Sequence, residues 1–128
     1  MKINSAKELV VYQKAYERAM KAFELSKQFP PEERYALTGQ FRRALRSVCL
    51  NLREAWAKRR YEAHFVSKLT DCDGENAEAD SCSDFALDCG YISRAEHQAL
   101  AARSEEIGRL LGSMILNPKK WTTAASDL

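Results

Sequence analysis

The chain has 128 residues, of which 45% are hydrophobic and 30% charged, with only five glycines, three prolines and a formal net charge of +2. This length suits a single domain with one buried core, and the scarcity of glycine and proline favours helices. The longest purely aliphatic run, Leu9–Val11, is too short for a membrane span or for the apolar core of a signal peptide, so we expect a cytoplasmic protein with no membrane partner.

The first predicted helix runs from Ser5 to about Gln28. Ser5 and Glu8 have the spacing of a capping box, in which two side chains satisfy the first backbone N–H groups of a helix. Two apolar stripes follow at helical spacing. One contains Leu9, Tyr12, Tyr16, Ala19, Met20 and Phe23, and the other contains Val11, Ala22, Leu25 and Phe29. Two stripes on one helix predict two burial partners, which we interpret as a bundle core and a second subunit.

The second predicted helix carries both an apolar stripe and a row of arginines. It follows Pro30 and Pro31, because consecutive prolines cannot occupy a helix interior, and it extends from near Tyr35 or Thr38 to about Lys58. Its apolar side contains Leu37, Phe41, Leu45, Val48, Leu52 and Ala55. A separate stripe contains Arg42, Arg46, Arg53 and Arg60, if the helix reaches that far. At about 100° per residue, the directions of these four side chains around the helix axis differ by at most about 40°.

The third helix is predicted at about Tyr61 to Cys89, after a turn inferred from length alone, since one helix through both segments would be too long for a compact domain. One face has heptad-like spacing and contains Phe65, Leu69, Cys72, Asn76, Ala79, Ala86 and Cys89. Apart from the first two, most of these residues are small. Gly90 indicates a C-terminal cap, and Ser93 with Glu96 forms a second capping box. The fourth helix then runs to about Leu116, where Asn117 and Pro118 stop it.

Four helices joined by short turns predict an all-α, antiparallel up-down-up-down four-helix bundle. We assign residues 1–117 to the bundle and residues 118–128 to a C-terminal tail, in which Trp121 is expected to dock on the body.

No motif in the sequence predicts an enzyme, a cofactor or a metal site. No glutamate is followed three residues later by a histidine, which removes the di-iron motif of helical bundles, and phosphate-loop, nucleophile-elbow and zincin motifs are absent. His64 and His97 are isolated in charged surroundings and are expected to be solvated. Core packing rather than zinc ligation or disulfide formation is expected of Cys49, Cys72, Cys82 and Cys89.

Charge is segregated along the chain. Seven basic residues and one acid lie between Gln40 and Arg60, whereas seven acids and no base lie between Asp71 and Gly90. A row of arginines on a helix spaces positive charge at roughly 6–11 Å, which is comparable to phosphate spacing along nucleic acid. We therefore predict RNA or DNA binding through Arg42, Arg43, Arg46, Arg53, Arg59 and Arg60. Trp56 would stack on a base or on an arginine plane.

The same segregation has a second interpretation. Arg42 and Arg46 would pair with acids of the third helix, and Trp56 would lie in the core or at an interface. If the pairing runs between subunits, the protein is a purely structural homo-oligomer that ignores nucleic acid. The residues alone leave both interpretations open.

Several separated motifs, in order from about Leu9 to Leu116, resemble the four-helix bundle proteins encoded in bacterial 23S rRNA intervening sequences. They are Leu9–Tyr16, Phe29–Pro30, Glu33–Ala44, Ser47, Asn51, Glu54, Gly74, Glu78 and Gly90–Ser93. The segment Ile107–Ile115 is also similar to a related branch, the accessory variability determinants of diversity-generating retroelements.

This resemblance implies a four-helix bundle that assembles into a homopentameric, barrel-like ring. In the retroelement branch it also implies binding to a reverse transcriptase and, through a basic surface, to nucleic acid. No catalytic residues come with the family.

Overall fold

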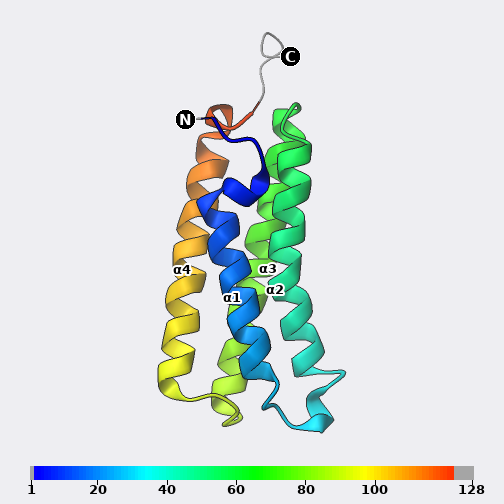
Figure 1. Ribbon diagram of the computed structural model, residues 1–128, viewed down its shortest axis with the longest axis vertical. Helices are drawn as coiled ribbons and strands as arrows, with labels where there is room; N and C mark the ends of the chain where they lie inside the picture. The colour runs from blue at the N-terminus through cyan, green and yellow to red at the C-terminus, as the bar shows by residue number, and fades with distance from the viewer. Residues whose placement is uncertain (1, 123–128) are drawn as a thin grey trace.

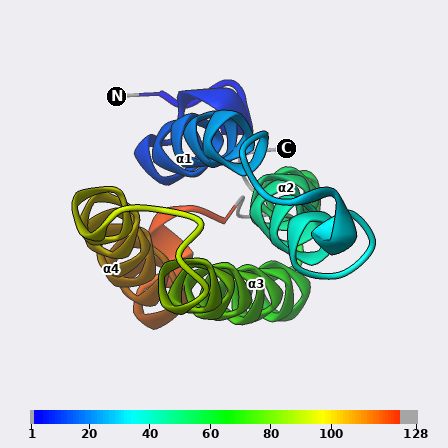
Figure 2. The ribbon, with the colours of Figure 1, turned by 90° about the horizontal axis from the view of Figure 1, so that it is seen from below.

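The computed structural model describes residues 2–122. Its four long helices are α1 (Val10–Ser26), α2 (Leu37–Ala57), α3 (Glu62–Asp88) and α4 (Arg94–Leu116). They alternate in direction (Figure 1) and follow one another around the bundle in chain order, so that α4 closes against α1 (Figure 2). Three short 3-10 helices complete the fold, η1 (Ala6–Glu8), η2 (Pro31–Glu33) and η3 (Pro118–Lys120). The predicted all-α four-helix fold is confirmed.

The first helix begins later than the sequence predicts. The capping box is present, with the Ser5 N–H donating to the Glu8 carboxylate at 3.0 Å and the Ser5 hydroxyl accepting from a backbone N–H of the first turn. It caps only η1, however, because Leu9 adopts an extended backbone (φ −68°, ψ 132°) that separates η1 from α1. This break places the side chains of Ala6 and Leu9 in the core. Burial of these two side chains stabilises the break between η1 and α1.

The boundaries of α2 agree with the prediction at both ends, and they remove Arg60 from the arginine stripe. Pro31 opens η2 and Leu37 starts α2, which ends at Ala57. Residues 58–60 form the turn that leads into α3. Arg60 therefore lies three residues beyond the helix, and its predicted alignment with Arg42, Arg46 and Arg53 is not realised.

The turn from α3 to α4 is built as the sequence indicates. Gly90 has φ +79°, a left-handed conformation that glycine adopts at little cost. The Gly90 N–H donates to the Leu87 carbonyl and the Tyr91 N–H to the Ala86 carbonyl, which satisfies the end of α3 in a Schellman pattern. A complete capping box of Ser93 and Glu96 then starts α4.

A buried polar layer divides the core into two apolar clusters. The cluster near the start of α1 includes Val48, Leu52, Phe65, Leu69, Ile107 and Leu111. The cluster near the end of α1 includes Phe29, Phe41, Leu45, Ala79, Ala86 and Leu100. Between them lie Arg18, Asn76 and Ser104, from α1, α3 and α4, with exposed fractions of 2%, 6% and 8%.

Three of the four cysteines pack in the core as expected, whereas the prediction for Cys89 is wrong. Cys49, Cys72 and Cys82 are buried, and burial raises the pKa of the Cys72 thiol to about 12 and those of the other two to about 11. Cys89 is exposed, because α3 ends at Asp88 and the chain turns away from the heptad-spaced face at Gly90.

The segment after α4 begins with Asn117 and Pro118, which end the helix as predicted. Trp121 then packs against the cluster near the start of α1, as expected. The remainder of the predicted tail, residues 123–128, lies outside the described residues. Within residues 2–122, every helix falls short of the length or hydropathy that a transmembrane segment requires.

Candidate nucleic-acid interface

Two arginines of the predicted site converge on an aromatic side chain of the neighbouring helix. The guanidinium carbons of Arg42 and Arg46, on α2, lie 4.6 and 5.7 Å from the centroid of the Phe23 ring of α1. The ammonium of Lys27 lies 5.1 Å from the same centroid. Three cations therefore share one ring, and cation–π attraction holds them near it.

Neither Arg42 nor Arg46 has a carboxylate oxygen within 4.0 Å among residues 2–122. The interpretation in which these two arginines pair with acids of the third helix is therefore wrong within a single chain. The physical reason is geometric, since both side chains lean toward α1 rather than toward α3.

Arg43 is the arginine that pairs with α3. Its Nη2 donates to both oxygens of Glu78 at 3.0 Å, and its Nη1 lies 3.8 Å from the Glu75 carboxylate. Gln40 donates a further hydrogen bond to Glu78, and this bond, with Glu75 and Arg43, holds the pKa of Glu78 below its usual value. Burial and the neighbouring Glu78 raise the pKa of Glu75. The charge of Arg43 is thus balanced by two carboxylates of α3, on the exposed side of the two helices.

The remaining candidate arginines surround the end of α2. The Arg59 guanidinium lies 4.1 Å from the Trp56 ring, and its Nη1 donates to the Trp56 carbonyl at 2.8 Å. Trp56 is half-buried against the core, so it stacks on an arginine plane rather than offering a free face to a base. Arg53 and Arg60 are exposed and, in the described part of the chain, have no carboxylate within 4.0 Å.

Sequence reasoning missed the buried Arg18. Its Nη1 donates to the Asn76 side-chain oxygen at 2.6 Å and to the Ser104 hydroxyl at 3.0 Å, while Nε and Nη2 have no partner within residues 2–122. Burial lowers the pKa of Arg18 to about 10, so it stays charged at neutral pH. The signal was present, because position 18 lies seven residues after Val11 and four before Ala22, on the stripe that packs in the core.

The two stripes of α1 have different environments. Val11, Ala22 and Phe29 are buried in the core. On the other stripe, Leu9 and Ala19 are buried as well, whereas Tyr16 and Met20 are 53% and 48% exposed. The Tyr16 ring stacks on that of Tyr12 with centroids 6.1 Å apart. A shallow cavity of about 580 Å³ lies over this face and is lined by Lys7, Tyr12, Gln13, Tyr16, Glu17 and Met20. This apolar surface is unpartnered within the described chain.

The two histidines differ from one another. His64 is exposed as expected. His97 is not simply solvated, because its Nε2 lies 2.7 Å from an Asp84 oxygen and ties the start of α4 to the end of α3. Within residues 2–122, no three His, Cys, Asp or Glu side chains are grouped so that they would hold a metal ion.

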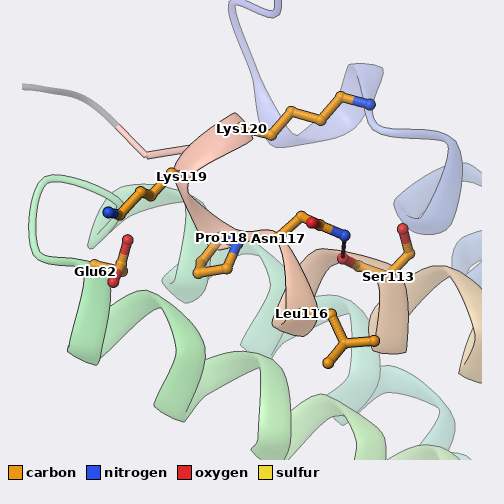
Figure 3. Close-up of a pocket in the computed structure, with 7 residues that line it drawn as sticks. All are labelled: Glu62, Ser113, Leu116, Asn117, Pro118, Lys119 and Lys120. Carbon is orange, nitrogen blue, oxygen red and sulfur yellow. Dashed lines mark hydrogen bonds between the residues drawn. The ribbon is translucent and has the colours of Figure 1, made fainter.

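A second cavity, of about 550 Å³, lies where α4 ends and α3 begins (Figure 3). It is lined by Glu62, Ser113, Leu116, Asn117, Pro118, Lys119 and Lys120. Asn117 donates to the Ser113 carbonyl at 3.2 Å, and Lys119 extends toward Glu62 while Lys120 extends away from it. None of the arginines of α2 is among the residues that line this cavity.

Comparison with known proteins identifies a family and several similar solved chains. Residues 7–113 match the family described as 23S rRNA-intervening sequence protein. The chain is also similar to a crystal structure from Bacteroides thetaiotaomicron, described as a protein of unknown function from the S23 ribosomal protein family. The two share 29% identity with a TM-score of 0.75, over 83% of this chain and 95% of the other. No curated protein matches the chain.

Proposed function

The chain belongs to the 23S rRNA-intervening sequence protein family, and from that premise we propose that it is a non-catalytic, oligomeric module that binds nucleic acid along α2. One observation carries the proposal. Arg42, Arg46 and Arg53 present positive charge along one helix, with no carboxylate within 4.0 Å of any of them in the described chain.

Uncompensated arginines on an open surface suit a polyanion better than a small ligand. Binding by such a surface is driven by release of counterions from the phosphates, so it depends little on sequence and strongly on salt. Because Arg43 is balanced by Glu75 and Glu78, we exclude it from the proposed contact surface. Arg53, Arg59 and Arg60 would extend the surface beyond Arg42 and Arg46 toward the end of α2.

We further propose that the protein assembles with copies of itself through the apolar face of α1. Tyr16 and Met20 are half-exposed beside Tyr12, and burying this face would remove apolar area from water. The homopentameric ring implied by the family resemblance would repeat the arginine surface around its outside. Repetition would raise the affinity for a long nucleic acid through several weak contacts.

Fluorescence anisotropy with a labelled single-stranded RNA, measured at 50 and 200 mM salt, tests the binding proposal. Replacing Arg42, Arg46 and Arg53 by alanine is expected to weaken binding at least tenfold at 50 mM salt. The matched control replaces Arg94, Arg109 and Lys119, which carry the same charge on α4 and η3. This control should stay within about twofold of wild type. Absence of binding at low salt, or equal losses in both variants, would contradict the proposal.

A purely structural homo-oligomer is the second candidate. Asp73, Asp80 and Asp88 have no cationic partner within 4.0 Å among residues 2–122, so they are available to arginines of another subunit. This candidate predicts that the assembly dissociates as salt rises and that RNA has no effect. Light scattering from 50 mM to 1 M salt separates the two candidates. An assembly held by an apolar interface should keep its molar mass over that range, whereas one held by charge pairs should dissociate.

A further inference from the structure

The Phe23 cluster, defined here as Phe23, Ser26, Lys27, Arg42 and Arg46, joins the end of α1 to the first half of α2. Its three cations lie 4.6 to 5.7 Å from one ring centroid. Like charges gathered around one ring repel one another, and the ring quadrupole compensates only part of that repulsion. An anion placed among the three cations would compensate the rest.

The chain itself supplies little of that compensation. Among residues 2–122, the carboxylate within 4.0 Å of a cation of the cluster is that of Glu24, which pairs with Lys27 at 3.1 Å. Both side chains of this pair are more than half exposed, so the surrounding water screens their attraction. Arg42 and Arg46 have no carboxylate within 4.0 Å in the described part of the chain.

Ser26 holds Arg42 in one orientation. The Ser26 hydroxyl donates to the Phe23 carbonyl at 2.8 Å and accepts a hydrogen bond from Arg42 Nε at 2.8 Å. Ser26 is only 2% exposed, so this anchor belongs to the folded interior. Both Nη groups of Arg42 are left without a hydrogen-bond partner in the described chain. They form a preoriented fork, the geometry with which arginine binds two oxygens of one phosphate.

We propose that the Phe23 cluster is a phosphate-binding subsite. Arg42 binds two phosphate oxygens through its Nη groups, Arg46 and Lys27 add positive charge, and Ser26 is the positioning residue. The inference rests on the proposed function, since the proposed ligand is a phosphate group in the backbone of a nucleic acid. Inorganic phosphate shares the same chemistry and is therefore the second probe.

Arg43 is the natural comparison for Arg42. It is the next residue on the same helix, yet its guanidinium is already occupied by both oxygens of Glu78. A lysine at position 42 would keep the charge and lose the fork, whereas a lysine at position 43 would leave the cluster untouched.

The first experiment follows the arginine Nε–H signals by NMR while inorganic phosphate replaces chloride at constant ionic strength. Saturable shifts are expected at Arg42 and Arg46, with none at Arg43. In Ser26→Ala, the shift at Arg42 should weaken. No shift, or equal shifts at all three arginines, would overturn the subsite.

The second experiment measures RNA affinity by anisotropy for Arg42→Lys and Arg43→Lys. Arg42→Lys is expected to bind roughly fivefold more weakly and Arg43→Lys within about twofold of wild type. Both changes keep the charge, and circular dichroism of each variant checks that its helices are retained. Equal affinities for the two variants would overturn the subsite.

The two experiments distinguish failure of the phosphate subsite from failure of the proposed nucleic-acid function. Phosphate shifts without any RNA binding would support the subsite, with free phosphate as its ligand, and would overturn the nucleic-acid function. RNA binding without phosphate shifts, and with no effect of Arg42→Lys, would leave that function standing and overturn the subsite.

Discussion

Replacing Asn76 by alanine removes the centre of the buried polar layer. Asn76 accepts a hydrogen bond from Arg18 at 2.6 Å and donates one to the Ser104 carbonyl at 3.0 Å. After the replacement, the Ser104 hydroxyl is the one hydrogen-bond partner that residues 2–122 still offer the Arg18 guanidinium. A charged donor left unpaired in a protein interior retains its desolvation cost, so the loss exceeds that of two ordinary hydrogen bonds.

The magnitude follows from the two bonds. The bond to the charged guanidinium contributes about 1.5–3 kcal/mol and the neutral bond about 1 kcal/mol. We therefore expect Asn76→Ala to lower the free energy of unfolding by about 3 kcal/mol, which for a chain of this length lowers Tm by roughly 10 °C. The matched control, Asn117→Ala at an exposed position, should cost about 0.5 kcal/mol or less.

Urea denaturation followed by circular dichroism, at one fixed protein concentration, measures both variants. The double variant Arg18→Met/Asn76→Ala should be more stable than the sum of the single changes implies, with a coupling of at least about 1 kcal/mol. A loss below about 1 kcal/mol for Asn76→Ala, or strict additivity in the double variant, would refute the role given to this layer.

Three further outcomes are expected. Ser93→Ala removes the cap of α4 and should lower the free energy of unfolding by about 1 kcal/mol in urea titrations. Glu78→Gln should destabilise at neutral pH, because a carboxyl whose pKa is lowered by folding contributes stability above its unfolded pKa. That contribution is lost as pH falls through the folded pKa, so the difference from wild type in pH-dependent melts should vanish in acid. Tyr16→Ser with Met20→Gln should reduce the mass seen by light scattering while leaving the helical circular dichroism unchanged.

Much of the fold follows from local signals in the sequence. Pro30 and Pro31 exclude a helix interior, Gly90 supplies a left-handed turn, and Ser93 caps α4, so these boundaries depend on a few neighbouring residues. The break at Leu9 was not predictable in this way. It depends on burying Leu9 and Ala6 against distant helices, which overrides a correct capping signal.

The candidate site was predictable in its charges and not in its contacts. Helical spacing places Arg42 and Arg46 on one stripe, but the direction in which they lean is set by Phe23 on another helix. Helical spacing also does not predict that Arg43 forms ion pairs with Glu75 and Glu78 of α3. Arg18 was the opposite case, since its position on the buried stripe was visible and its charge argued against burial.

The salt dependence of RNA affinity tests the central claim most directly. The logarithm of the association constant for single-stranded RNA, plotted against the logarithm of salt concentration, should fall steeply for the wild-type protein. In Arg42→Ala/Arg46→Ala, the slope should become shallower by about 1.4, because each lost phosphate contact removes about 0.7. A variant slope equal to that of the wild type would contradict the account.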